Sequence, residues 1–108
     1  MTFELAKRLI DETNKTKLKV LQDELFKYAI EYSRIRVDWY MMEDAERKEI
    51  EDLRTAKHNA LIDCCNILSR EMIKVGEDAS WREMLGNDRK EMGDFACYIN
   101  LILGIKGR

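Results

Sequence analysis

The chain contains no proline, and none of its first 75 residues is glycine. Average usage predicts roughly five prolines in a sequence of this length. Because proline interrupts helices and glycine weakens them, this composition permits long uninterrupted helices over most of the chain. The five glycines, which are the natural chain breaks, all lie after residue 75. The sequence therefore favours long helices first and the turns in its last third.

Residues 48–75 carry hydrophobic side chains on two faces of one predicted helix. The first row comprises Ile50, Leu53, Lys57 through its aliphatic stem, Ala60, Leu61, Cys64, Leu68 and Val75. The second row starts near His58 and comprises Ile62, Cys65, Ser69, Met72 and Ile73. A helix with one apolar row lies on a core, whereas a helix with two lies between neighbours. We predict that this segment is the central helix, with the preceding helix on the first row and the last helix on the second.

The preceding segment has a clear helical row over residues 18–35. Asp38 is a possible N-cap of the next helix, and the acidic residues 43, 44 and 46 suit the positive end of a helix. The alternative is one rod over residues 17–75, which would exceed roughly 85 Å and need another chain to bury it. We favour a folded-back hairpin. Residues 1–14 are expected to pack as an extra arm, with a polar break at residues 13–16.

Glycines and capping patterns divide the rest of the chain. Gly76 predicts the end of the central helix. Ser80-Trp81-Arg82-Glu83 has the form of a capping box for a short helix that Gly86 stops. A second box at residues 88–91 opens a last helix that ends at Gly104. Its expected buried face comprises Met92, Phe95, Ala96, Ile99, Ile102 and Leu103.

These elements predict an all-α fold: a small up-down helical bundle with long antiparallel helices, a two-faced central helix and a short connector helix. A chain of 108 residues is one domain, spanning residues 1–108. The net charge of −2, with both signs interspersed, argues against nucleic-acid binding, which needs a basic surface. There is no apolar run long enough to cross a membrane and no signal-peptide pattern, and three cysteines suit a reducing cytosol. We therefore expect a cytoplasmic protein.

Arg54 and the single histidine, His58, are the first candidates for catalysis. Small helical ribonucleases use an Arg-x4-6-His motif in which histidine acts as acid or base and arginine steadies phosphate. The spacing here is Arg-x3-His, one residue short of that pattern. The alternative is a histidine at the edge of a packed face, which we favour because one histidine without a second positioned group is no active site.

Acidic pairs and cysteines are the other candidates for chemistry. Glu43, Glu46 and Glu49 recur every three residues, and residues 91–94 form a Glu-x-x-Asp pair. Such pairs bind magnesium in helical pyrophosphatases, although they arise by chance in a chain this acidic. Neighbouring cysteines at 64 and 65 diverge on a helix, and Cys65 lies two turns from the histidine. We expect structural cysteines, and we predict no metal and no cofactor.

The group Trp39-Tyr40-Met41-Met42 is the candidate interface. If the last helix does not cover it, the group is an exposed apolar patch, which marks partner surfaces. Otherwise it forms the end layer of the bundle core, the reading that we favour.

Residues 58–70 (HNALIDCCNILSR) and 88–98 (DRKEMGDFACY) resemble a small bacterial family known as a domain of unknown function, over residues 50–108. The resemblance implies a cytosolic bacterial helical protein and brings no activity, cofactor or catalytic residue.

Surplus apolar surface on long helices leads to our main hypothesis, a non-enzymatic protein-protein interaction module that forms a homodimer. The alternative is a phosphate-directed hydrolase or ribonuclease-like helical enzyme that uses Arg54 and His58, or the acidic pairs with magnesium.

Overall fold

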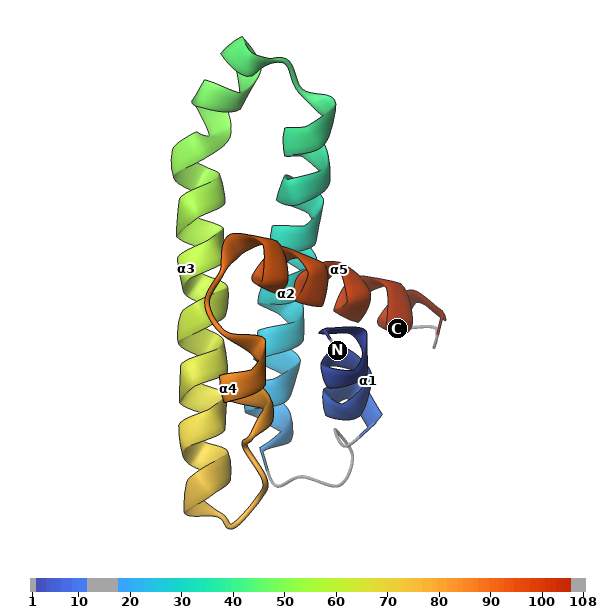
Figure 1. Cartoon of the computed structure of the whole chain (residues 1–108), viewed down its shortest axis with the longest axis vertical. Helices are drawn as coiled ribbons and strands as arrows, with labels where there is room; N and C mark the ends of the chain where they lie inside the picture. The colour runs from blue at the N-terminus through green and yellow to red at the C-terminus, as the bar shows by residue number, and fades with distance from the viewer. Residues whose placement is uncertain (1, 12–17, 106–108) are drawn as a thin grey trace.

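The computed structural model describes residues 2–11 and 18–105, which form five helices and no strand (Figure 1). The helices are α1 (Thr2–Asp11), α2 (Lys19–Met41), α3 (Asp44–Lys74), α4 (Trp81–Leu85) and α5 (Arg89–Ile105). The molecule is elongated, at 47 × 27 × 24 Å. The all-α bundle, the long antiparallel helices and the short connector helix α4 are confirmed.

Helices α2 and α3 form an antiparallel hairpin, so the long-rod alternative is wrong (Figure 1). The chain turns at Met42, whose N–H donates to the Trp39 carbonyl oxygen over 3.3 Å. Asp38 lies inside α2, so the prediction that it caps the next helix is wrong. The N-cap of α3 is Glu43, and the acidic residues of the first turn follow it as expected.

The end of α3 follows from Gly76, as predicted. Its φ of 80° lies in the left-handed region, which glycine adopts without a steric penalty. The N–H of Glu77 donates to the Met72 carbonyl oxygen over 2.8 Å, and the N–H of Gly76 donates to that of Ile73 over 3.1 Å. This pair of bonds is the Schellman motif, which satisfies carbonyl groups at a helix end.

The start of α4 differs from the predicted capping box. The backbone of Ser80 is itself helical, and its side chain makes no capping hydrogen bond. Instead, the Asp78 carboxylate accepts the Ser80 N–H over 2.9 Å, and it also pairs with Arg8 of α1. These bonds hold the pKa of Asp78 at about 2, mainly through the Ser80 N–H and secondly through Arg8. Gly86 ends the helix as expected, with φ of 70°.

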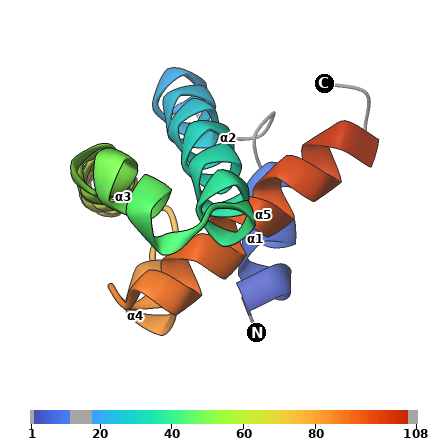
Figure 2. The ribbon, with the colours of Figure 1, turned by 90° about the horizontal axis from the view of Figure 1, so that it is seen from above.

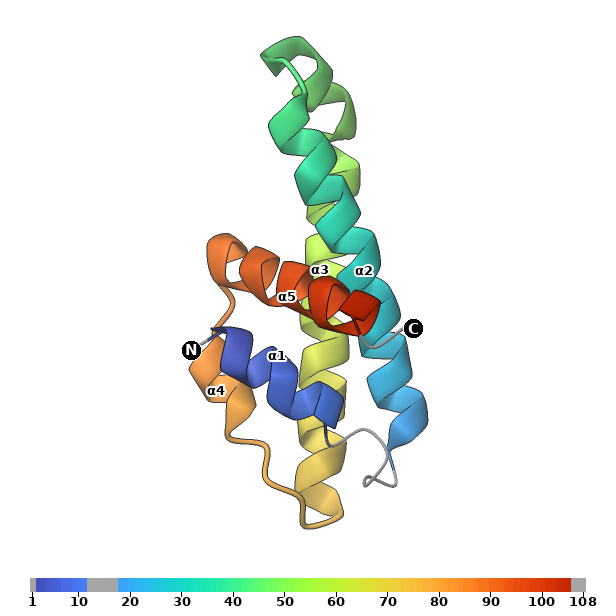
Figure 3. The same ribbon diagram turned by 90° about the vertical axis from the view of Figure 1, so that its right-hand side faces the viewer.

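The helices form two layers (Figure 2). One layer is the α2–α3 hairpin, and α1, α4 and α5 form the other (Figure 3). The extra arm is confirmed for α1, which packs on α5, while the predicted break at residues 13–16 lies outside the described residues. Helix α5 packs mainly on α2 and α1 and touches α3 only slightly, so the expectation that it covers a second row of α3 is wrong. Helix α2, and not α3, is therefore the long helix that packs extensively on two neighbours, α3 and α5.

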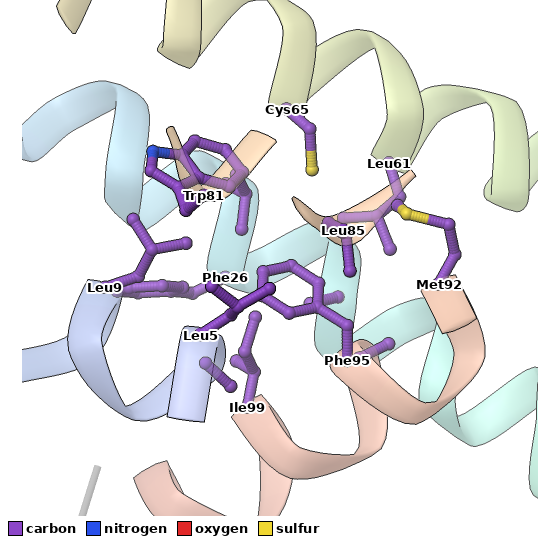
Figure 4. Packing of buried hydrophobic residues seen from close by; sticks show 14 of the residues in the cluster. Leu5, Leu9, Phe26, Leu61, Cys65, Trp81, Leu85, Met92, Phe95 and Ile99 are labelled. Atoms are coloured by element: carbon purple, nitrogen blue, oxygen red, sulfur yellow. The ribbon is translucent and has the colours of Figure 1, made fainter. Parts of the chain in front are cut away.

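The core gathers the apolar faces of both layers (Figure 4). Its largest fully buried side chains include Trp81, Tyr32, Phe95, Leu9, Leu25, Leu61, Leu68, Met72, Leu85, Met92 and Ile99. The face predicted for the last helix is confirmed, with Leu103 only partly buried. Helix α3 has neighbours in both layers, but its buried residues form one row: His58, Leu61, Cys65, Leu68 and Met72. Leu53, Ile73 and Val75, which we assigned to the two rows, are exposed.

The hairpin extends beyond the second layer (Figures 1 and 3). All of residues 34–57 are described, and none of them is buried. We call this part the hairpin tip, and we call residues 2–11, 18–33 and 58–105 the packed base. The tip has α2 and α3 to pack against each other and no third helix along most of its length.

Candidate functional site

Trp39 is the centre of the contacts between α2 and α3 in the hairpin tip. The Arg54 guanidinium lies 4.2 Å from the centroid of the indole ring, and that of Arg47 lies 5.4 Å from it. Arg47 Nε also donates to the Trp39 carbonyl oxygen over 2.8 Å. A guanidinium over an aromatic ring is attracted by the ring's electron-rich face. The two arginines of α3 therefore hold Trp39 between the helices, where it is half-buried.

Arg54 is engaged in this packing rather than pointing into open solvent. Its side chain is 17% exposed, and one guanidinium nitrogen lies 3.9 Å from the Glu51 carboxylate. Its Nε is buried without a hydrogen-bond partner among the described residues. The position that we considered for steadying a phosphate is thus covered by an indole on one face.

His58 lies one turn further along α3 and is only 7% exposed. Its ring meets Tyr32 edge-on at 5.6 Å, and its Nδ1 lies 3.4 Å from the Asn59 side-chain oxygen. Its Nε2 is buried with no hydrogen-bond partner in the described part of the chain. Burial raises the pKa of the Tyr32 hydroxyl, and the positive charge of nearby Arg54 offsets part of that effect. The structure thus brings Arg54, His58 and Tyr32 into one neighbourhood but gives the histidine no carboxylate partner among the described residues.

A second set of contacts ties the tip to α5. Arg36 pairs with Asp94 over 2.9 Å and donates to the Cys97 sulfur over 3.7 Å. Gly93 makes room for this side chain, since a Cβ at Gly93 would lie 2.7 Å from Arg36 Nε. Sequence reasoning missed this contact, although a glycine inside a helix can indicate a close approach.

Arg89, at the start of α5, makes the matching contact with α3. One guanidinium nitrogen donates to Thr55 Oγ1 over 2.9 Å, and another lies 3.4 Å from the Glu51 carboxylate. Glu51 is therefore shared between Arg54 and Arg89. Arg36 and Arg89 thus fasten α5 to both helices of the hairpin, at the border between base and tip.

The acidic pairs are not assembled into a metal site. Glu43, Glu46 and Glu49 are exposed at the end of the hairpin. The Asp94 carboxylate forms ion pairs with Arg36 and with Lys90, whose Nζ lies 3.4 Å from it. No group of three or more metal-ligating side chains occurs within residues 2–11 and 18–105.

The three cysteines are free thiols. Burial raises the pKa of Cys65 to about 12, so its thiol stays protonated and unreactive. Burial, with the nearby charges of Glu24 and Asp63, also raises the pKa of Cys64. Neither thiol is activated as a nucleophile, in keeping with the structural role that we expected.

The predicted interface group is divided between two environments. Trp39 is half-buried against arginines of α3 and Met42 is half-buried in the turn that follows α2, whereas Tyr40 and Met41 are exposed, Met41 to 82%. The four residues therefore form neither a complete end layer of the core nor a complete exposed apolar patch. The exposed patch consists of Tyr40 and Met41 together with Val37, one turn earlier on α2.

Among the described helices, none combines the length and apolar character that a membrane span requires. No protein-family model, no curated protein and no solved structure matches the chain.

Proposed function

We propose that the chain is a non-enzymatic protein-protein interaction module that self-associates through the hairpin. The observation that carries this proposal is the hairpin tip, where no residue of 34–57 is buried although the segment exposes Val37, Tyr40, Met41 and Leu53. Most helical stability in proteins comes from packing an apolar face rather than from intrinsic propensity. A two-helix projection with surplus apolar surface therefore gains stability when another surface covers it.

The chemistry of the tip favours a protein partner over nucleic acid. Acidic and basic side chains are interspersed along both helices, so the tip offers no continuous basic stripe for phosphates. A cytoplasmic setting belongs to the same proposal and is supported by the three free cysteines, which suit a reducing compartment, whereas a bacterial origin rests only on the resemblance of residues 50–108.

Sedimentation velocity over a range from low to high micromolar concentration tests self-association. We expect a concentration-dependent shift from monomer to dimer, and a stable monomer at the highest concentration would overturn the proposal. Val37→Lys should weaken the dimer, because it places a charge in the apolar patch. Ile73→Lys is the matched control, since Ile73 is also exposed, at 68% against 55% for Val37, but lies at the end of α3 far from the tip, in the packed base.

The phosphate-directed enzyme remains a second proposal with less support. In its favour, Arg54 Nε and His58 Nε2 are buried nitrogens without hydrogen-bond partners among the described residues. Against it, the histidine is covered by the fold and the arginine by Trp39. Hydrolysis of RNA or of a generic phosphodiester, with and without magnesium, would support it if His58→Ala abolished the activity while the fold was retained.

A further inference from the structure

One face of α2 carries no buried residue along its whole length. The residues on it are spaced alternately by three and four, and they are Val20, Asp23, Lys27, Ile30, Arg34, Val37 and Met41. We call this row the outward seam. The exposed fractions of Val20, Val37 and Met41 are 79%, 55% and 82%. The buried residues of α2 lie on its other sides, toward α3 and α5.

Two helices pack as a coiled coil when apolar residues recur at alternating three- and four-residue spacing, and four of the seven seam residues are apolar. The hairpin with α3 uses a different row of α2, so the outward seam is additional to the contacts of the bundle. Its apolar members are not isolated, because Val37 shares a surface hollow with Leu101 of α5, and Ile30 shares another with Phe26 and Leu103. A neighbouring helix on the seam would therefore cover apolar surface of α5 as well.

The charges in the seam indicate what kind of helix fits. Asp23 lies near one end, Arg34 lies toward the other, and apolar residues lie beyond both. In an antiparallel pair of identical helices, each seam residue meets one from the opposite half of the other copy. The acid in one half of each copy then lies opposite the base in the other half of its partner. Because a two-fold axis relates the copies, this contact occurs twice.

We propose that α2 packs antiparallel against α2 of a second copy along the outward seam. In this register Val20 of one copy lies opposite Val37 of the other, Arg34 lies opposite Asp23, and Lys27 lies opposite Ile30. Each of these facing pairs occurs twice, because a two-fold axis relates the two copies. The proposal rests on the self-association proposed above and adds the orientation and the register along α2, in which Val37 of the tip is covered while Tyr40, Met41 and Leu53 lie outside the paired residues.

Neighbouring registers match the seam less well. A shift by seven residues in one direction places Arg34 opposite Ile30 and Met41 opposite Asp23. Each of the two charged residues then lies opposite an apolar residue. A shift by seven in the other direction also pairs Asp23 with Lys27 and Val20 with Ile30, but the overlap then ends near Ile30 and leaves both Arg34 and Val37 uncovered. Lys27 is the one charge without an opposite partner in the proposed register, and such a residue fixes register at a cost in stability.

The present partner of Asp23 does not block this arrangement. Its carboxylate pairs with Lys19 over 2.6 Å on the exposed side of α2. An exposed i,i+4 ion pair stabilises a helix only slightly, because solvent screens it. The carboxylate is therefore free to turn toward an arginine of another copy.

A charge exchange tests the register. Asp23→Arg and Arg34→Asp are made as two separate variants, and each is studied by sedimentation velocity alone and after mixing. In each single variant the facing charges have the same sign at both ends, so the dissociation constant should rise by about tenfold or more. In a mixture of the two variants, a heterodimer has opposite charges at both ends, and association should return.

Two further variants separate the seam from the tip. Val20 lies in the packed base but belongs to the seam, so Val20→Lys should weaken the dimer as Val37→Lys does. Ile73 lies outside the seam, so Ile73→Lys should leave the dimer intact. Lys27→Leu should tighten the dimer, because it removes the unmatched charge. Circular dichroism and a urea midpoint for each variant show whether it is folded.

The outcomes are distinct. A monomeric wild-type protein overturns both the proposed function and this inference. A wild-type dimer that resists both charge variants, or variants that do not associate when mixed, overturns the register while self-association stands. Dissociation by each variant with recovery on mixing supports the register.

Discussion

The packed base and the hairpin tip are built from the same two long helices, yet they have opposite relations to the core. In the base, α2 and α3 are covered by the layer of α1, α4 and α5, and residues such as Leu25 and Leu61 are completely buried. In the tip, the helices continue without that layer, and no residue is buried. A helical hairpin thus gains a core where a third element crosses it. Where none does, aromatic-arginine contacts and ion pairs hold it together.

The largest difference is expected from removing an apolar side chain in each region. Phe95→Ala in α5 should lower the free energy of unfolding by about 3–5 kcal/mol, because Phe95 is fully buried and its loss leaves a cavity. Leu53→Ala in the tip should change it by no more than about 0.5 kcal/mol, because Leu53 is already exposed. Urea denaturation measures both. Equal losses would mean that the tip is packed as tightly as the base.

A smaller effect is expected from Trp39→Ala. The substitution removes the ring on which Arg54 and Arg47 lie, and each cation-π contact is worth about 0.5–1 kcal/mol at a surface. We expect a loss of about 1–2 kcal/mol, with faster amide hydrogen exchange over residues 34–57 and little change over residues 58–74. Hydrogen exchange that accelerates equally in both ranges would show that tip and base open together.

The smallest effect concerns Asp94, which ties the base to Arg36 of the tip. Partial burial opposes its ionisation, but the hydrogen bond and charge of Arg36, with a contribution from Lys90, hold the pKa below the ordinary 3.8. The unfolded chain therefore binds this proton more readily than the folded one. The stabilisation is present above about pH 5 and is lost as the pH falls through the depressed pKa.

Asp94→Asn should accordingly lower the free energy of unfolding by about 1 kcal/mol at pH 7 and by less near pH 2. Urea titrations at a series of pH values measure the difference. Asp52→Asn is the control, because Asp52 is exposed in the tip. If the two variants changed the free energy of unfolding by the same amount at every pH, the ion pair of Asp94 with Arg36 would make no specific contribution to stability.

Much of the helical framework could be predicted, because its signals are local. Gly76 and Gly86 end helices through their own backbone conformation, and the row of Phe95 and its neighbours is clear within one segment. The caps at Asp38 and Ser80 were wrong for a local reason as well. Capping patterns describe what a side chain can do, whereas the backbone at both positions is helical.

The order of helices around the core was harder to predict, since α2 and α3 both have apolar residues on more than one side. A pattern along one helix does not show which row meets which neighbour. The contacts of the candidate site depend on residues far apart in sequence, such as Arg36 with Asp94 and Arg89 with Thr55. The pair Arg54 and His58 was found from spacing, but the cover that Trp39 and Tyr32 provide follows only from the folded hairpin.

The chain has two tryptophans, and each region holds one of them. Trp81 is fully buried in the base, with its indole N–H 3.3 Å from the Met72 sulfur, whereas Trp39 is half-buried in the tip between two arginines. Their fluorescence emission should differ in wavelength, and a Trp→Phe substitution at either position leaves a probe for the other region. The natural sequence thus supplies an optical reporter for each half of the molecule without any added label.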